Sequence, residues 1–384
     1  DDSPELHAKD TYLGGDKKGD MNVINVMTRN ALAGAEWCRD YLGIRFEPDN
    51  LFFFGGHSRK RALIPVGHTG TEFITKFLAK ADELGIPVIT NMKAEELLKD
   101  KAGRVVGVKA TMNGTEYTFN AKGGVVLATG GFGANPAMVK KYNPKIDERF
   151  KTTDAPGTTG EALYMAQRAG AELVNMQYIQ TYPICDPISG VIELIADARF
   201  DGAIMLNQEG KRFVEELGRR DVLSEAILDQ TGGYCWVLWN DKIGAVSNTV
   251  KEHPTEYDAF TKQGIMTTCP DLKCIADFTK IPYDSLKGTV DRVTSMAGKG
   301  NDKDFHHRAG LVDMSQGQYY VIKAVPSVHH TMGGVRINEK AQALTAGALG
   351  CGGSDRRHAR HKPFGRQCLH GHHCVRPNRR QGCS

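Results

Sequence analysis

Long apolar runs and internal repeats are missing from this sequence. No apolar run approaches the roughly 20 residues of a membrane-spanning helix, and residues 1–4 do not begin a charged-then-apolar signal sequence. No repeat or low-complexity tract precedes the last 40 or so residues, which argues against a solenoid. We therefore expect a globular chain without a membrane span, and its 384 residues are enough for two or three domains.

The cysteines do not indicate a disulfide framework. Nine are present, and an odd number of them is scattered through the first 350 residues: Cys38, Cys185, Cys235, Cys269 and Cys274. This distribution leaves the redox compartment open.

The last 34 residues differ in composition from the rest of the chain. They hold eight Lys or Arg residues against one acid, Asp355, so the other 350 residues carry a net charge of −3 within the total of +4. Two functional interpretations of this tail are a basic nucleic-acid arm and a zinc site made by Cys351, Cys368, His370, His372 and Cys374. Neither shows interleaved aromatics or standard ligand spacing, so we expect no metal and no nucleic-acid partner.

Hydrophobic periodicity indicates a mixture of helices and strands. Apolar positions at helical spacing predict helices over 21–42, 71–84, 157–171 and 221–228. Short apolar or β-branched runs predict strands over 87–90, 104–111, 115–120 and 234–239, with a charged helix between the first two. The 43 glycines, about 11% of the chain against a usual value of about 7%, suggest tight loops near a ligand.

The string 123–133 is the clearest local pattern. Its apolar run ends in Gly130-Gly131-Phe132-Gly133, as a buried parallel strand does where its end meets a cofactor. A structural strand followed by a tight turn would have the same sequence pattern, so both interpretations remain open.

Three motifs in order carry a family resemblance. They are Thr129-Gly130-Gly131-Phe132, then 207–213 (NQEGKRF) with Arg219-Arg220-Asp221, then 328–334 (VHHTMGG). To about residue 346 the chain resembles the flavin-dependent fumarate reductase and succinate dehydrogenase flavoprotein superfamily, and most of all its soluble, single-chain branch. The resemblance implies an α/β fold with a glutathione-reductase-like FAD-binding domain, here incomplete, and an inserted α+β capping domain. The implied boundaries are 1–181 for the FAD-binding domain, 182–328 for the cap, 329–346 for the return and 347–384 for an aberrant, disordered tail.

The resemblance also implies that the cofactor is FAD. It implies further that the electron donor is an upstream flavin or haem carrier, which is either a domain or a separate protein. The FAD contacts that it implies are Thr129, Gly130, Gly131, Asp154, Gly160, Thr331, Met332 and Gly333. A helix that begins after Gly160 suits an anion such as a pyrophosphate, although most such helix ends are merely capped.

Four further residues match the family's catalytic and substrate-binding positions. Family members reduce the double bond of an unsaturated carboxylate by hydride transfer from flavin N5, and Arg220 matches the arginine that donates the proton. Since arginine is normally protonated at any usable pH, it can donate only if a relay reprotonates it, and Arg199 matches a relay arginine. His329 matches the histidine that binds a substrate carboxylate, and His330 is either a ligand or a packed neighbour. The alternatives are that Arg220 is a surface residue beside Asp221 and that Arg199 makes a structural ion pair.

Two departures from the family pattern bear on the substrate. Tyr182 occupies the place of a histidine that precedes proline, and Ala196 occupies the place of a relay glutamate, with Asp197 one position later. A buried carboxylate repels a second substrate carboxylate and favours an imidazole N–H. This pair resembles the signature of urocanate reductases, which convert urocanate to imidazole propionate. If Tyr182 merely packs and Asp197 caps a turn, the substrate is fumarate or another acrylate. A separate open alternative is a non-catalytic flavoprotein fragment.

Both ends depart from the family pattern. No Gly-x-Gly-x-x-Gly turn precedes the first residue, so we expect the chain to begin about a hundred residues into the flavoprotein domain. From Leu349 the sequence no longer matches the family pattern. When plausible codons are written for this stretch and read one nucleotide later, they spell AAGEVTGGMHGTNRLGGNA, a string like the one with which the family continues. We therefore predict a change of reading frame near Gly347, which removes a carboxylate-binding arginine at Pro363 and Phe364 and leaves the chain poorly active. The sequence gives no prediction of the compartment.

Overall fold

The computed structural model describes residues 1–52 and 56–344, which fall into two compact units. Unit 1 combines Asp1–Phe132, Thr159–Met176 and the chain from Met332; unit 2 combines Gly133–Thr158 and Gln177–Thr331. The segment 133–158, which the sequence analysis assigned to the FAD-binding domain, belongs to unit 2 by its contacts. The boundaries at 181/182 and 328/329 stay a prediction, and the predicted frame change lies outside the described residues.

Unit 1 contains helices and three small antiparallel sheets. Its helices are α1 (Pro4–Gly14), α2 (Met21–Asp40), α3 (Thr71–Glu83) and α5 (Glu161–Arg168). Its strands are β1 (Phe46–Phe52) with β2 (Ala62–Pro65), β3 (Lys93–Lys99) with β4 (Val105–Met112) and β5 (Thr115–Asn120), and β7 (Leu173–Val174) with β13 (Gly334–Val335). A small apolar core joins α5 to the three-stranded sheet, through side chains such as Leu97, Val105 and Ala166.

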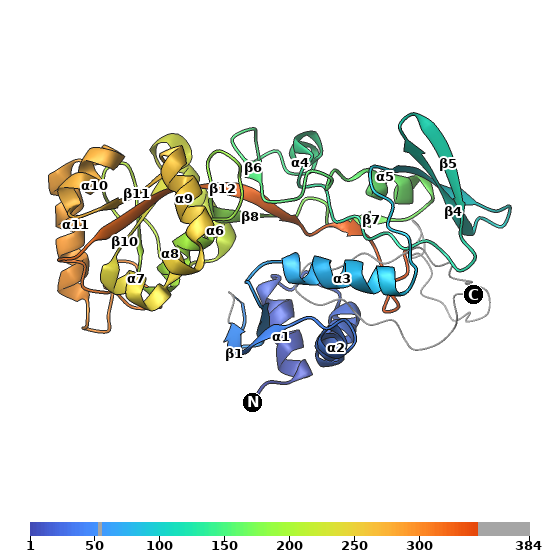
Figure 1. The fold of residues 1–384 in the computed structure, drawn as a ribbon, viewed down its shortest axis with the longest axis horizontal. Coiled ribbons are helices and arrows are strands. Elements are labelled where there is room, and N and C mark those ends of the chain that lie inside the picture. The colour runs from blue at the N-terminus through green and yellow to red at the C-terminus, as the bar shows by residue number, and fades with distance from the viewer. Residues whose placement is uncertain (53–55, 345–384) are drawn as a thin grey trace. The chain divides into compact units, whose positions relative to one another are not determined.

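Unit 2 is built around one mixed sheet. Its strands are β6 (Lys151–Thr152), β8 (Ile179–Cys185), β9 (Ile204–Leu206), β10 (Cys235–Asn240), β11 (Met266–Cys269) and β12 (Tyr319–Thr331). The long strand β12 pairs with β10 and β11 along its first half and with β6 and β8 along its second (Figure 1). Only the β6–β12 pairing is parallel among the described strand pairs of this sheet.

Unit 2 also contains helices, several of which pack on this sheet. They are α4 (Pro136–Tyr142), α6 (Arg220–Leu228), α7 (Asp241–Ser247), α8 (Thr249–Glu252), α9 (Pro254–Gln263), α10 (Leu272–Thr279) and α11 (Tyr283–Met296), with the 3₁₀ helices η1 (Leu194–Asp201) and η2 (Thr231–Gly233). Strand β10 is apolar except for its last residue and buried at every position, because it lies between two strands and under helices. Such burial stabilises the unit by roughly 25 cal/mol for each Å² of apolar surface removed from water. A rigid framework of this kind can hold charged side chains in fixed positions.

Most predicted elements are confirmed. The helices expected over 21–42, 71–84, 157–171 and 221–228 correspond to α2, α3, α5 and α6, and the strands over 104–111, 115–120 and 234–239 correspond to β4, β5 and β10. The boundaries differ by up to four residues, as expected where caps and fraying decide an end.

Three local predictions are wrong. Residues 93–99 form strand β3 instead of a charged helix, because pairing with β4 buries Leu97 and overrides the helix propensity of the segment. Residues 87–90 and 123–131 form no strand, and Val88 and Val126 are more than half exposed. Neither segment has a strand partner within residues 1–52 and 56–344, and a strand persists only where a neighbour completes its hydrogen-bond ladder.

The structure also contains one disulfide that the sequence analysis did not expect. Cys269, at the end of β11, is bonded to Cys274 in α10, whereas Cys38, Cys185 and Cys235 are free. The two cysteines are only five residues apart, but the odd number of cysteines spread over the first 350 residues gave no indication of a pair. No helix in the described part of the chain combines the length and apolar character needed to cross a bilayer.

Candidate active site

A cluster of polar side chains inside unit 2 is built on strand β8. Gln180 and Tyr182 are two residues apart on this strand, so their side chains leave the same face. Tyr182 is 6% exposed. Its burial raises the pKa of the phenol, with a smaller contribution from the nearby Asp197 carboxylate. The phenol therefore stays protonated, and its oxygen is able to accept a hydrogen bond.

Two arginines converge on Tyr182. The Arg199 Nη2 donates to the Tyr182 hydroxyl oxygen at 3.3 Å, and the guanidinium of Arg220 lies 4.7 Å from the centre of the Tyr182 ring. Arg220 also donates from Nη1 to the Gln180 side-chain oxygen at 2.9 Å. A ring face attracts a cation, and the Gln180 bond fixes the orientation of the guanidinium. Arg220 is thus aimed by two contacts on β8.

The position of Arg220 makes its guanidinium group a weaker base. It is the first residue of α6, where the positive end of a helix disfavours another positive charge. Burial lowers the pKa of Arg220, and the neighbouring Arg199 lowers it further, while Tyr182 and Asp197 oppose the shift. A guanidinium in these surroundings is a better proton donor than one in water.

Asp197 completes the charged part of the cluster. It lies on η1, two residues before Arg199, and its Oδ1 is 3.8 Å from the Arg199 Nη2. That oxygen is buried without a hydrogen-bond partner, although a third of the side chain is accessible. Burial raises the pKa of Asp197 to about 6, against the pull of Arg199 and Arg220. Near neutral pH its carboxyl group is therefore able to take up or release a proton.

His329 reaches the same cluster from β12. Val328 pairs with Thr181 and His330 with Gln180, so His329 is the extra residue of a β-bulge, a feature that redirects side chains. Its ring centre is 5.3 Å from that of Tyr182, and its Nδ1 is 2.8 Å from the Thr153 hydroxyl oxygen. If Thr153 donates to Nδ1, the histidine presents an Nε2–H donor.

The structure thus brings together five of the predicted residues, all within unit 2: Tyr182, Asp197, Arg199, Arg220 and His329. His330 pairs through its backbone with Gln180 in the β12–β8 ladder. The sequence analysis missed Gln180 and Thr153. Gln180 could have been found from its spacing of two from Tyr182 on one strand face, whereas Thr153 is 176 residues from His329 and gives no local signal.

The predicted cofactor residues include backbone that suits close approach of a flat ligand. In unit 1, Gly130 and Gly160 have φ values of 72° and 83°, and a side chain at Gly333 would collide with the backbone of Asn175. Gly160 is the N-cap residue of α5, which has no side-chain cap. In unit 2, Asp154 lies against Gly133, where a Cβ atom would meet its carboxylate. Thr129 and Met332 are exposed, whereas Gly131 is partly buried and Thr331 buried. The left-handed glycines and the start of α5 in unit 1 suit a dinucleotide cofactor, whereas contacts of Thr129, Asp154, Thr331 and Met332 with it stay a prediction.

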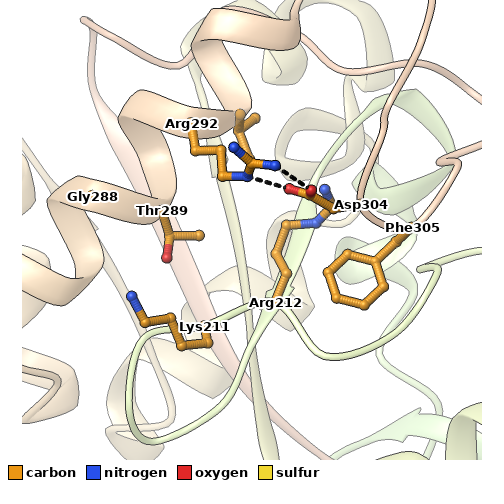
Figure 2. A pocket seen from close by; sticks show the side chains of 8 residues that line it. Lys211, Arg212, Gly288, Thr289, Arg292, Asp304 and Phe305 are labelled. Carbon is orange, nitrogen blue, oxygen red and sulfur yellow. Dashed lines mark hydrogen bonds and ion pairs between the residues drawn. The ribbon is translucent and has the colours of Figure 1, made fainter.

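The motif 207–213 serves the structure of unit 2. Arg212 is buried and bridges two buried acids, Glu216 at 2.7 Å and Asp302 at 2.8 Å. It also lines a cavity of about 160 Å³ with Lys211 and Arg292, shown in Figure 2. Because Arg292 is itself paired with Asp304, this cavity offers little uncompensated charge to a ligand. In residues 1–52 and 56–344, no three His, Cys, Asp or Glu side chains are grouped so that they could hold a metal ion.

Comparison with known proteins identifies the family. The family model described as "FAD binding domain" matches residues 1–352. The chain belongs to this family. Its cofactor is therefore FAD, as the glycine-rich backbone of unit 1 permits.

Two relatives and one solved structure are similar to this member of the FAD binding domain family. A urocanate reductase of Eggerthella lenta is 40% identical over 91% of the chain and 58% of the relative. An NADH:acrylate oxidoreductase of Vibrio harveyi is 35% identical over 89% of the chain and 35% of the relative. A flavocytochrome c3 fumarate reductase in its open conformation has a TM-score of 0.76 at 27% identity, over 96% of the chain and 61% of that structure. The chain thus spans less than two thirds of each of them.

Proposed function

We propose that this protein reduces the carbon–carbon double bond of an unsaturated carboxylate with FAD, and that its substrate is urocanate, which becomes imidazole propionate. The observation that carries the proposal is the placement of Arg220, which is held against Tyr182 beside Asp197. The similarity to a urocanate reductase, an acrylate oxidoreductase and a fumarate reductase supports the same class of reaction.

Arg220 would supply the proton of the reduction. Reduced FAD, when bound, supplies a hydride to the β carbon of the substrate. The α carbon then needs a proton, because negative charge develops there next to the carboxylate. Arg220 is the residue whose pKa is lowered and whose guanidinium is fixed by Gln180 and Tyr182. General acid catalysis by a positioned group of this kind contributes about 10²–10⁴ in rate.

His329 would hold the substrate carboxylate. Its Nδ1 contacts the Thr153 hydroxyl, so the imidazole can present Nε2–H as a donor to a carboxylate oxygen. The bulge in β12 and the neighbouring Tyr182 ring fix the direction of that donor. The carboxylate would thus be held at one end of the substrate, with the double bond between it and the group at the other end.

Tyr182 and Asp197 would select the imidazole end. With a pKa of about 6, Asp197 is ionised at neutral pH and accepts an imidazole N–H, whereas it repels the second carboxylate of fumarate. Charge-assisted bonds to a carboxylate are among the stronger hydrogen bonds in proteins. Asp197 would therefore carry the charge that separates urocanate from fumarate, and the buried Tyr182 beside it would complete the imidazole end.

Substrate binding by an Asp197→Asn variant tests this proposal without turnover. We expect the Kd of urocanate for the oxidised, FAD-loaded protein to rise at least about tenfold, since a charged hydrogen bond contributes about 1.5–3 kcal/mol. The Kd of fumarate should stay unchanged or fall, and the flavin content should be unaffected. Asp229→Asn, at the exposed C-cap of α6 and not among the groups that shift the pKa of Asp197, is the control. An equal loss of affinity for both substrates, or no loss for urocanate, would refute imidazole selection by Asp197.

A further inference from the structure

Arg199 is buried more deeply than Arg220, the other arginine that contacts Tyr182. Its Nη2 donates to the Tyr182 hydroxyl oxygen at 3.3 Å, and its ion pair with Asp197 is long, at 3.8 Å. The shortest polar contact of its guanidinium with the described residues is made by Nη1, which donates to the main-chain carbonyl oxygen of Glu216 at 3.1 Å. The orientation of this buried cation therefore depends on where the Glu216 backbone lies.

Glu216 lies in a segment without helix or strand. Residues 211–219, which precede α6, form only turns, bends and irregular backbone, so no ladder of hydrogen bonds fixes them. The Glu216 side chain is fully buried, and its Oε1 accepts the backbone N–H of Met205 at 3.2 Å. Met205 belongs to β9, which stands at the end of the strand order β11-β12-β10-β9. The carboxylate thus takes the place of a further strand beside β9 and ties the irregular segment to the sheet.

The ion network of Arg212 holds the same carboxylate. Arg212 donates to Glu216 from Nε at 2.7 Å and from Nη2 at 2.8 Å, and Nη2 also donates to Asp302 at 2.8 Å. Asp302 in turn accepts the backbone N–H of His307 at 3.1 Å. All four residues are buried, and hydrogen bonds between ionised groups are among the stronger ones in proteins. The Glu216 side chain therefore has a fixed position, and its main chain is held with it.

We propose that Glu216 is a positioning residue of the active site. Its buried carboxylate fixes its own main-chain carbonyl, which orients the Arg199 guanidinium and, through it, the Tyr182 hydroxyl group at the imidazole end of the substrate. In this role Glu216 does not touch the substrate and acts only through Arg199. The inference rests on the proposed function, and it gives the motif 207–213 a part in substrate binding, because Arg212 of that motif holds Glu216.

A purely structural role of the network gives a different expectation. If the network only stabilises unit 2, breaking it at Glu216 or at Asp302 should have the same effect on urocanate binding. Asp302 binds Arg212 and the backbone N–H groups of Asp304, Phe305 and His307, none of which belongs to the cluster around Tyr182. Asp302→Asn is therefore the matched control for Glu216→Gln, since each variant keeps the shape of the side chain and removes one charge from the network.

The first test measures the Kd of urocanate for the oxidised, FAD-loaded protein. Glu216→Gln should raise this Kd about tenfold, because a displaced Arg199 no longer bonds to the Tyr182 hydroxyl group. Asp302→Asn should leave the Kd unchanged, although both variants should unfold at a lower urea concentration than the wild type. In an Arg199→Met background the effect of Glu216→Gln on the Kd should vanish, because the residue through which Glu216 acts is gone.

A second test follows Arg199 itself and needs neither substrate nor turnover. Its Nη1 and Nη2 are bonded to different partners, which hinders rotation of the guanidinium about the Nε–Cζ bond. In heteronuclear NMR spectra of the arginine side chains, the two Nη signals of Arg199 should be separate in the wild type and in Asp302→Asn. They should merge in Glu216→Gln, where the carbonyl is no longer fixed. Their loss in Arg199→Met identifies these signals.

Three results of the binding test would overturn the proposal. They are a wild-type Kd in Glu216→Gln, an equal loss of affinity in Asp302→Asn, and a loss that persists in the Arg199→Met background. If the wild-type protein binds neither urocanate nor fumarate, the proposed function itself fails. The NMR comparison then decides alone whether Glu216 orients Arg199, and separate Nη signals in Glu216→Gln would show that it does not.

Discussion

At the scale of single residues, the proposed reaction depends on how Arg220 is held. Its guanidinium has a ring face on one side, an amide oxygen at 2.9 Å and a second arginine nearby. These contacts orient the side chain, and burial favours its release of a proton. Arg219, one residue earlier, is exposed and paired with Asp221 at 2.6 Å, so adjacent arginines differ entirely in their surroundings.

Replacement of Arg220 by lysine should abolish most of the activity. Lysine keeps the charge but cannot present a planar guanidinium to both Tyr182 and Gln180. We expect kcat for urocanate to fall about 10²–10⁴-fold, with a much smaller change in KM. Steady-state dye oxidation measures both constants, and Arg219→Lys is the control. Equal small losses in the two variants would contradict the role of Arg220 as the proton donor.

The residue types of the cluster could be predicted from the sequence, but their partners could not. Tyr182, Asp197, Arg199, Arg220 and His329 stand in recognisable motifs, and the structure brings them together. Their individual roles stay predictions. Thr153 gave no signal, because its partner His329 lies 176 residues away in the sequence and only the folded sheet brings the two together.

At the scale of secondary structure, hydrophobic periodicity was reliable where an element buries one face. Helix α2, which buries Ile24 and Thr28, and strand β4, which buries Val105 and Ala110, follow their patterns closely. Strand β3 does not, because its Glu- and Lys-rich sequence favours a helix until β4 pairs with it. The run 123–131 looked like a buried strand but has no pairing partner among the described strands. Periodicity reports on a segment alone, whereas a strand also requires a neighbour.

A buried network of ion pairs stabilises the segment that follows β9. Arg212 bridges Glu216 and Asp302, and all three side chains are at most 4% exposed. Arg212→Met should lower the free energy of unfolding by about 3–5 kcal/mol, because it leaves two buried carboxylates without a partner. Urea denaturation measures this change, and Lys211→Met, at an exposed neighbouring position, should change it by less than about 0.5 kcal/mol. Similar values for the two variants would show that the network does not stabilise unit 2.

At the scale of the whole molecule, family membership and the cluster in unit 2 agree. The FAD binding domain model matches residues 1–352, and the cluster holds the three residues to which the proposed function gives the roles of proton donor, carboxylate-binding group and imidazole-binding acid: Arg220, His329 and Asp197. The chain spans 58% of the urocanate reductase to which it is 40% identical.

The most direct measurement is the oxidation of reduced viologen dye by the FAD-loaded protein, with urocanate and fumarate compared side by side. We expect urocanate to be reduced with the higher kcat/KM, because Asp197 attracts an imidazole N–H and repels a second carboxylate. A preference for fumarate would contradict the assignment of Tyr182 and Asp197 to the imidazole. Failure to reduce either substrate would contradict the proposed reaction as a whole.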